Sequence, residues 1–543
     1  MTSAAKFCLN SAQQAVCDSN AATLLVTGGA GTGKTATAAA AARAHLLRGK
    51  GSAGSSSVRD RVLFLTFSRT AVSQILNRSR GILGDVADQV DIFTFHGLAW
   101  QLICDFGRYA GHGERPLLRG EAESKLFVDD PQYLSYDDLL PEALKIIDLP
   151  IIGSLTQRRW SLVICDEFQD TDDKQWQLLE LLTASENRLL LLCDPNQMIY
   201  DGFLGARGVG PRRLQVARRR AGLEEISLPI GSYRDPTQLL PTVAEAVRIR
   251  NFSHPSIIEA ISNGRLRIVR IPEENPSVDV VCDAVNESRK RGARSFGLFV
   301  HGNEPTASMS ASLAQNGVNH VVVGLSESYG EALVALATML EFVLGKIAWD
   351  DVLARLAVFY TSTVRSKQAP PLAFQIASGQ ASGLLGRRLD ELRDELSQTS
   401  SLIEAAKIAG SSWAKLALGR GTRPWRRATA EIGRYVALAD NESPVEAIRR
   451  RAEEMRAKSF TEIDYSDRST VQLMNLHQTK GREADAIVAA FRSKDYFGHE
   501  MEPFERSSRL LYVVLTRARQ QVTLIIPRSP HPLVAPFASL VPE

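Results

Sequence analysis

The sequence predicts an α/β fold with mostly parallel sheets, because three short apolar runs lead into glycine or acidic residues. The first, TLLVT at residues 23–27, leads through a glycine-rich turn into an alanine-rich segment that favours helix. Two further runs, LVIC at 162–165 and LLLLC at 189–193, each end in an aspartate. Ligands of α/β sheets bind at the carboxyl ends of the strands, so all three run ends are candidate functional positions.

The glycine-rich turn matches the phosphate-binding pattern G-x-x-x-x-G-K-[ST] in full. It comprises Gly28, Gly29, Ala30, Gly31, Thr32, Gly33, Lys34 and Thr35. Backbone N–H groups of such a loop surround phosphate oxygens, and the following helix adds partial positive charge. Lys34 is expected to reach the β- and γ-phosphates, and the Thr35 hydroxyl to bind Mg²⁺. The alternative is a glycine-rich turn without a ligand, but the full match between strand and helix predicts a nucleotide site.

The acidic run ends predict the groups that act on the phosphates. Asp166 suits Mg²⁺, and Glu167 is placed to polarise an attacking water. An acidic loop after a buried strand is the alternative, and the phosphate loop upstream favours the catalytic interpretation. After the third run, the neutral amide of Gln197 could sense a γ-phosphate, although D-P-N-Q is also ordinary turn chemistry.

Composition bounds the class of protein. The 543 residues suffice for several domains, and a formal net charge of +3 gives no global field for a polyanionic partner. Six scattered cysteines without a C-x-x-C pair indicate a reduced protein without a structural zinc site. We expect no signal peptide at the N-terminus and find no apolar run of bilayer length, so a cytoplasmic protein without a membrane partner is predicted.

Further segments resemble, in order along residues 7–526, the UvrD/Rep/PcrA group of superfamily 1A DNA helicases. Besides the phosphate loop, the segments that carry the resemblance are FCLNSAQQAV, FLTFSRTAVSQILNR, IFTFHGLAWQLI, SYDDLLPEALKII, DEFQD, ISLPIGSYRDPTQLL, FGLFVHGNEP with GVNHVVVG, VQLMNLHQTKGREADAIV and RLLYVVLTRARQQVTLII. So many ordered matches imply an ATPase that acts on DNA.

The resemblance assigns roles at the nucleotide. Arg234 and Arg517 correspond to two arginine fingers, which would neutralise the γ-phosphate from another domain. Gln13 corresponds to the glutamine that reads adenine, Tyr233 would stack on the base, and Glu483 would hold the ribose. Taken singly, either arginine could be a surface residue or part of a structural ion pair.

The resemblance also implies a single-stranded DNA site. Stacking of bases is expected from Phe67, Tyr200 and Phe203, and backbone contacts from Thr94, His96 and His477. The alternative for each aromatic residue is a place in the core. Two basic segments, residues 210–220 and 419–428, could contact phosphates or form solvated faces, and the second contains Trp425.

Three departures from the family pattern affect these expectations. Ala36 follows Thr35 where relatives usually have an arginine that covers the adenine, which puts nucleotide preference in doubt. IYDGFLGA replaces an I-Y-G-W-R-G-A pattern and carries one extra residue, with Phe203 for tryptophan and Leu204 for arginine. The chain is also compact, with short stretches where relatives have accessory domains.

The resemblance implies two RecA-like α/β motor domains, each interrupted by one insertion, the second largely helical. The expected bounds are 1–97 with 151–222 for the first motor domain, 98–150 for its insertion, 223–330 with 462–543 for the second motor domain, and 331–461 for its insertion. The implied activity is ATP-driven movement on single-stranded DNA, 3′ to 5′, with unwinding at junctions of single and double strands.

Two other functions are open from the sequence. The first is a helicase-like regulatory subunit that depends on a partner, for instance a nuclease in a Gabija-like anti-phage system, as the reduced accessory regions suggest. The second is a nucleotide switch that binds ATP with Mg²⁺ but has no motor action. Unwinding by the purified chain would argue against the first, and ATPase stimulation by single strands against the second.

Overall fold

The structure is a computed structural model of the chain, and it describes most of the sequence. The described residues are 8–51, 61–67, 81–113, 116–127, 133–183, 187–199, 209–229, 231–322, 327–364, 368–437, 445–446 and 470–541. The chain divides into two compact units. Unit 1 comprises Met1–Leu102, Leu140–Val323 and Asp464–Glu543, and unit 2 comprises Ile103–Leu139 and Gly324–Ile463. Tyr200, Phe203 and Leu204 lie outside the described residues.

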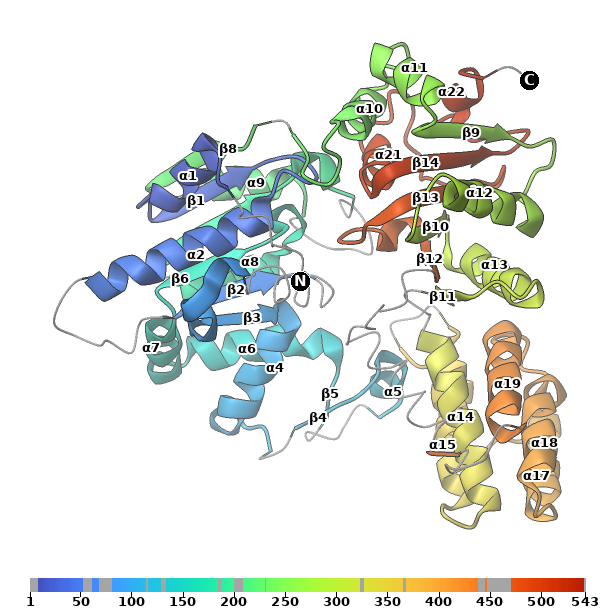
Figure 1. The fold of residues 1–543 in the computed structure, drawn as a ribbon. Coiled ribbons are helices and arrows are strands. Elements are labelled where there is room, and N and C mark those ends of the chain that lie inside the picture. The colour runs from blue at the N-terminus through green and yellow to red at the C-terminus, as the bar shows by residue number, and fades with distance from the viewer. Residues whose placement is uncertain are drawn as a thin grey trace. The chain divides into compact units, whose positions relative to one another are not determined.

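The first sheet of unit 1 has six parallel strands in the order β3-β2-β6-β7-β1-β8. Their bounds are β1 Thr23–Thr27, β2 Val62–Thr66, β3 Val90–Thr94, β6 Leu162–Cys165, β7 Arg188–Cys193 and β8 Leu223–Ser227. The three apolar runs of the sequence are the central strands β1, β6 and β7, of which β1 and β6 are labelled in Figure 1. The prediction of an α/β fold with parallel strands is therefore confirmed.

Helices and short turns connect the strands of the first sheet. The helices are α1 Ser11–Asp18, α2 Lys34–Gly51, α4 Phe95–Phe106, α6 Leu139–Asp148, α7 Pro150–Arg159, α8 Asp173–Leu182 and α9 Pro211–Arg218. The alanine-rich face of α2 packs on the sheet, because Ala38, Ala39 and Ala42 are buried in one cluster with Val26 and Phe64. Small side chains let this helix approach the strands closely, which fixes its N-terminus against the end of β1.

A second six-stranded parallel sheet has the order β11-β12-β10-β13-β14-β9. Its strands are β9 Leu266–Arg270, β10 Phe296–Val300, β11 His320–Val322, β12 Val471–Asn475, β13 Ala484–Ala490 and β14 Ala518–Ile526. Figure 1 shows that this sheet joins green strands from the middle of the chain to red strands from its end. Its helices are α10 Leu239–Arg248, α11 Pro255–Ser262, α12 Val278–Lys290, α13 Asn303–Gln315, α21 Ser508–Leu515 and α22 Ala535–Ala538. Two such sheets fit two RecA-like motor domains.

Several expected domain boundaries differ from the structure. Strand β8, residues 223–227, pairs along its length with β1 in the first sheet, although the sequence placed it at the start of the second motor domain. The first insertion was expected at 98–150, yet only 103–139 joins unit 2. The cause is that α6 continues into α7 beside the first sheet, where α7 leads into β6. The assignment of the other segments to two motor domains and two insertions remains a prediction.

The described part of unit 2 consists mainly of helices. They are α5 Glu121–Leu126, α14 Glu327–Val343, α15 Trp349–Ser362, α16 Pro371–Ala377, α17 Gly383–Ser397, α18 Leu402–Leu416 and α19 Thr422–Ala437, with a two-stranded sheet of β4 Leu117–Leu118 and β5 Tyr133–Leu134. Trp413 and Trp425 stack with ring centroids 5.1 Å apart, and the Phe359 ring lies 4.4 Å from Trp413. The largely helical character of the second insertion is confirmed.

Two further features concern the helices and the cysteines. Within the described part of the chain, no helix is both long and apolar enough to cross a bilayer. All six cysteines are free thiols, and Cys165 and Cys193 are buried at the ends of β6 and β7. They serve as small core residues beside the polar strand ends that follow them.

Candidate nucleotide site

The phosphate loop lies between β1 and α2, as the sequence predicts. Gly31 and Gly33 have φ values of 82° and 84°, a left-handed backbone conformation that residues with a side chain rarely adopt. A Cβ on Gly31 would lie 2.1 Å from Ser232 Oγ, and one on Gly33 would lie 3.1 Å from Gln13 Nε2. Glycine is therefore required at both positions by conformation and by space.

Lys34 and Thr35, the two polar side chains that follow the last glycine of the loop, have protein partners. Lys34 Nζ donates to the carbonyl oxygens of Gly28 at 2.8 Å and Gly29 at 2.9 Å, and lies 3.7 Å from Asp194 Oδ2. The Thr35 hydroxyl donates to Asp166 Oδ2 at 3.0 Å. One hydroxyl and one carboxylate, open toward the phosphate loop, fit Mg²⁺, which takes few protein ligands and completes its shell with phosphates and water.

The acidic pair lies at the end of β6. Glu167 has φ 53°, and its backbone N–H donates to Asp166 Oδ1 at 2.9 Å. Burial, together with the Glu167 charge, raises the pKa of Asp166 to about 6. Burial alone would raise the pKa of Glu167 too, but the ammonium groups of Lys480 and Lys34 outweigh it and lower this pKa to about 2. Glu167 is thus ionised at neutral pH, as a group that polarises water must be.

Gln197 links the first sheet to Arg517. Its Nε2 donates to Asp194 Oδ2 at 2.6 Å, and its Oε1 accepts from Arg517 Nη2 at 3.1 Å. Arg517 is only 2% exposed, and burial together with the nearby Arg234 lowers its pKa to about 10, so it stays charged at neutral pH. Residues 197 and 517, far apart in sequence, therefore meet beside the phosphate loop.

Lys480 is a residue of this site that was not predicted from the sequence. Its ammonium contacts Asp170, lies 3.3 Å from Glu167 Oε2, and donates to the carbonyl oxygen of Gln197 at 3.1 Å. The only signal was its place in HQTKGREAD, a segment quoted for the resemblance. Asp170 is 3% exposed, and burial raises its pKa to about 7 despite the opposing effect of Lys480.

Arg234 and Glu483 are paired with each other. Arg234 Nε donates to Glu483 Oε2 at 2.8 Å, and its Nη1 donates to the carbonyl oxygen of Thr516. Glu483 also contacts Arg519. The segment that carries Arg234 thus lies beside the segment that ends in Arg517, as two arginine fingers at one site require. The Glu483 carboxylate is bound by the guanidinium groups of Arg234 and Arg519.

The residues expected at the adenine lie together. Gln13 is fully buried and caps the start of α1 through its bond with Asn10, and its Nε2 donates to the Thr32 carbonyl at 3.2 Å. The Tyr233 hydroxyl donates to Gln13 Oε1 at 3.4 Å, while the tyrosine as a whole is 59% exposed. An exposed aromatic ring beside a buried amide leaves a surface on which a base could stack.

The described DNA candidates lie at strand ends. Phe67 follows β2, with its ring 5.9 Å from Phe95, and Thr94 ends β3, where its hydroxyl accepts from the Gly97 N–H at 2.9 Å. His96 follows in the first turn of α4. His477 lies after β12, and burial with the nearby His301 lowers its pKa to about 4, so it is neutral at pH 7. Any contact of His477 with a phosphate would thus be a hydrogen bond.

Both basic segments contain core residues. Arg213 is 2% exposed, pairs with Asp173, and donates to the Thr171 carbonyl at 2.9 Å. Trp425 is also 2% exposed, and its Nε1 donates to the Ala409 carbonyl at 3.2 Å. Because both side chains are buried, neither is available to nucleic acid. The basic pattern of the sequence does not show which residues of each segment face the core.

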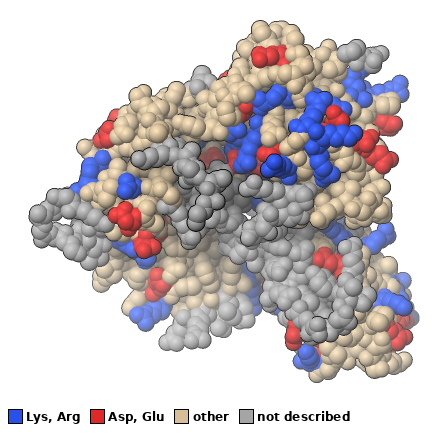
Figure 2. Space-filling model, in the orientation of Figure 1, with Lys and Arg blue, Asp and Glu red and all other residues tan. Residues whose placement is uncertain are grey.

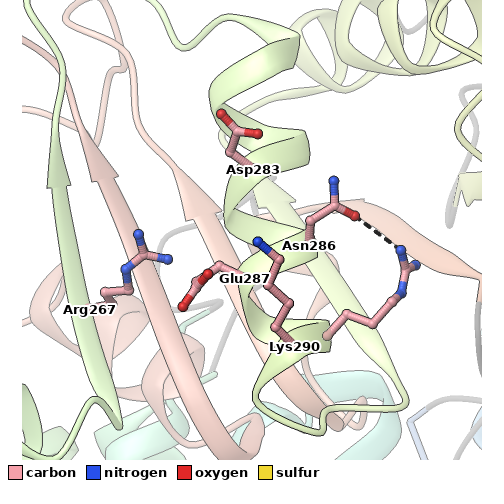
Figure 3. A pocket seen from close by; sticks show the side chains of 6 residues that line it. Arg267, Asp283, Asn286, Glu287 and Lys290 are labelled. Atoms are coloured by element: carbon pink, nitrogen blue, oxygen red, sulfur yellow. Dashed lines mark hydrogen bonds between the residues drawn. The ribbon is translucent and has the colours of Figure 1, made fainter.

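A separate polar cavity of about 550 Å³ lies between β9 and α12. Figure 3 shows Asp283, Asn286 and Glu287 along the helix with Arg267 on the strand opposite. Arg289 and Lys290 complete the lining, and Arg289 donates to Asn286 at 3.1 Å. In Figure 2, Lys and Arg side chains gather on this part of the face with acidic residues among them. The mixed charge selects no single class of ligand.

Comparisons with known proteins agree with this geometry. A family profile described as "AAA domain" matches residues 12–203, which include the phosphate loop and the acidic pair. RecBCD enzyme subunit RecB of Mycolicibacterium smegmatis is 46% identical over 70 residues, 12% of this chain and 6% of RecB. ATP-dependent DNA helicase PcrA of Bacillus subtilis is 21% identical over 386 residues, 59% of this chain and 51% of PcrA.

A third relative matches over most of both chains. ATP-dependent DNA helicase Rep of Salmonella typhimurium is 22% identical over 646 aligned positions, 95% of this chain and 90% of Rep. By contrast, the chain spans about half the length of PcrA and 6% to 11% of the RecB relatives. The motif order, the two parallel sheets and these relatives point the same way: the chain is similar to superfamily 1 helicases of the UvrD/Rep/PcrA type.

Proposed function

We propose that the protein is an ATP-dependent DNA helicase that moves 3′ to 5′ on single-stranded DNA and unwinds duplexes at junctions. One observation carries the proposal. Beside the phosphate loop, Arg517 Nη2 lies 3.1 Å from Gln197 Oε1, and Lys480 Nζ lies 3.3 Å from Glu167 Oε2, so two residues of the first sheet meet two from segments beside the second sheet. A triphosphate on the loop would therefore be acted on by residues of both sheets. The relatives named as ATP-dependent DNA helicases support the activity.

Charge neutralisation at the γ-phosphate would come from three cationic side chains. Lys34 would exchange its carbonyl partners for phosphate oxygens, while Arg517 and Arg234 would approach from the other side. Glu167, ionised because its pKa is about 2, would orient and deprotonate the attacking water. Thr35 and Asp166 would hold Mg²⁺, which when bound neutralises charge on the phosphates.

Gln197 would report hydrolysis to the second sheet. It bridges Asp194 and Arg517 in the structure, so an amide that turns toward a γ-phosphate must change its bond with Arg517. Loss of the phosphate would reverse that change. This gives a physical route from bond breaking to a shift between the two sheets, each of which carries DNA candidates at its strand ends.

At the nucleoside, Gln13 and Tyr233 would bind the adenine. The ribose contact proposed for Glu483 requires that its carboxylate share or release Arg234 and Arg519. Release would free Arg234 for the phosphates. Phe67, Tyr200 and Phe203 would stack bases, and Thr94, His96 and His477 would contact the DNA backbone.

The test is ATP turnover measured with and without single-stranded DNA. Glu167→Gln should abolish the stimulated rate, whereas Glu180→Gln, an exposed carboxylate on α8, should leave it unchanged. Unwinding is then compared on duplexes with a 3′ or a 5′ tail, and the 3′-tailed substrate should be preferred. If Glu167→Gln hydrolysed ATP at the wild-type rate, the role assigned to Glu167 would be wrong. If the wild type itself bound ATP but did not hydrolyse it, the nucleotide switch would be favoured.

A second candidate is a partner-dependent subunit that acts with a nuclease. The observation that favours it is the similarity to RecB, which is named as a subunit of the RecBCD enzyme. The same unwinding assay decides between the two. A purified chain that unwinds the tailed duplex efficiently needs no partner, and one that hydrolyses ATP without unwinding supports dependence.

A further inference from the structure

Tyr512 reaches the phosphate loop from helix α21 of the second sheet. Its hydroxyl oxygen accepts a hydrogen bond from the backbone N–H of Ala30 at 3.1 Å. The tyrosine is 4% exposed, and burial raises the pKa of its phenol, which therefore keeps its proton at neutral pH. Tyr512 was not among the residues expected at the nucleotide, although it lies five residues before Arg517.

The contact is part of a packed junction. Ala30 is 6% exposed and belongs to one apolar cluster with Leu239, Leu240 and Tyr512. A Cβ added to Gly29 would lie 3.3 Å from the Tyr512 hydroxyl, so this oxygen lies against two consecutive loop residues. A larger residue at position 29 would press on the tyrosine, and the glycine leaves room for it.

In this arrangement protein atoms hold groups that a nucleotide would use. Backbone N–H groups of the loop and the Lys34 ammonium are the groups that bind phosphate oxygens. Here Ala30 N–H is held by Tyr512, and Lys34 is held by the carbonyls of Gly28 and Gly29. A buried N–H left without an acceptor is costly, so the phenol oxygen stabilises the loop in the absence of phosphate.

We propose that Tyr512 is a positioning residue whose hydroxyl occupies the Ala30 amide until a nucleotide phosphate replaces it. The proposal rests on the proposed function, since it takes the loop as the nucleotide site. The hydroxyl then competes with phosphate, and its removal should strengthen nucleotide binding. A residue that merely supports the loop would have the opposite effect.

The exchange would also move the segment that carries the arginine finger. The Thr516 N–H donates to the Tyr512 carbonyl at 3.0 Å, and Arg517 Nε donates to the Val513 carbonyl at 3.0 Å. These bonds join Tyr512 and Arg517 in one short helical segment. Arrival of a phosphate at Ala30 would thus be transmitted to Arg517 before hydrolysis.

The test measures the Kd of ADP and of a non-hydrolysable ATP analogue at fixed Mg²⁺ and salt. Tyr512→Phe keeps the ring and removes the acceptor, and binding should tighten about 3- to 10-fold, the range that one net hydrogen bond supplies. The KM for ATP should fall by a similar factor, with kcat unchanged or lower. Tyr512→Met, which also lacks the hydroxyl but fills the space flexibly, should tighten binding as well.

The matched control is Tyr329→Phe, a buried tyrosine of unit 2 whose hydroxyl bonds Glu431. It should leave both Kd values unchanged. Hydrogen exchange supplies a second readout, because without nucleotide the amides of residues 25–33 should exchange faster in Tyr512→Phe than in the wild type.

The proposal would be overturned if the wild type binds nucleotide, both Tyr512 variants bind it equally or more weakly, and hydrogen exchange at residues 25–33 is unaltered. If the wild type binds no nucleotide at all, the proposed function fails, and the inference about Tyr512 fails with it. The two failures are therefore distinguished by the wild-type measurement alone.

Discussion

Replacement of Lys480 by methionine should shift the pH dependence of ATP turnover. Lys480 Nζ lies 3.3 Å from Glu167 Oε2, and both groups are largely removed from water. Its charge is the main reason why the pKa of Glu167 is about 2 although burial acts in the other direction. Without the ammonium, burial is opposed only by Lys34, Gln169 and Arg517, so the pKa of Glu167 should rise toward its ordinary value of 4.5.

The size of the effect follows from that shift. A rise of about two pKa units, most of the way back to the ordinary value, would correspond to about 2.7 kcal/mol of lost preference for the ionised carboxylate. An acidic group is active as a base only above its pKa. Protonation of Asp166, whose pKa is about 6, should lower the turnover of both proteins as the pH falls. Lys480→Met should lose further activity relative to the wild type toward pH 5, because Glu167 then begins to take up a proton as well.

The assay is kcat/KM for ATP at saturating single-stranded DNA between pH 5 and 9. Lys174→Met is the matched control, because Lys174 is an exposed lysine on α8, and its profile should follow the wild type. Circular dichroism at each pH separates loss of fold from loss of catalysis. A Lys480→Met profile that superimposes on the wild type after scaling would refute the electrostatic role of this lysine.

Three other changes have effects that follow from the structure. Gly31→Ala should weaken nucleotide binding at least tenfold, because its Cβ would lie 2.1 Å from Ser232 Oγ at φ 82°; an unchanged Kd in titration calorimetry would count against the loop geometry. Thr35→Val keeps the shape but removes the hydroxyl, so the Mg²⁺ concentration for half-maximal turnover should rise, and an unaltered Mg²⁺ titration would remove Thr35 from the metal site. Trp425→Ala should destabilise unit 2 by about 3–5 kcal/mol in urea unfolding, as large core truncations do, and a loss below about 1 kcal/mol would show that Trp425 is not a core residue.

Local patterns predicted the first sheet and the phosphate site well. Residues 28–35 form a loop whose glycines, lysine and threonine each depend on backbone conformation and near neighbours, and such information is contained in eight consecutive letters. The runs that became β1, β6 and β7 are buried on both faces, so their apolar character is continuous in the sequence. Asp166, Glu167 and Gln197 follow directly from the strand ends.

Features that depend on contacts between distant residues could not be predicted from local sequence patterns. Strand β8 reads LEEIS, with two glutamates in an edge strand, and nothing local shows that it pairs with β1. Lys480 and Tyr512 act through contacts with residues more than 300 positions away, which no spacing rule could reveal. Trp425 lies among arginines in sequence, and the basic composition of residues 419–428 had suggested phosphate contacts or a solvated face. In the structure its indole is buried in the core of unit 2.

The central claim is that one triphosphate is acted on by the phosphate loop of the first sheet and by Arg517 beside the second. The most direct measurement is single-turnover ATP hydrolysis with saturating DNA by the wild type, Arg517→Lys and Arg517→Ala, with nucleotide affinity measured in parallel. Removal of an arginine finger should lower the rate by about 10³-fold or more, and the lysine, which lacks the planar fork, should restore little of it. A rate for folded Arg517→Ala within a few-fold of the wild type would contradict the account.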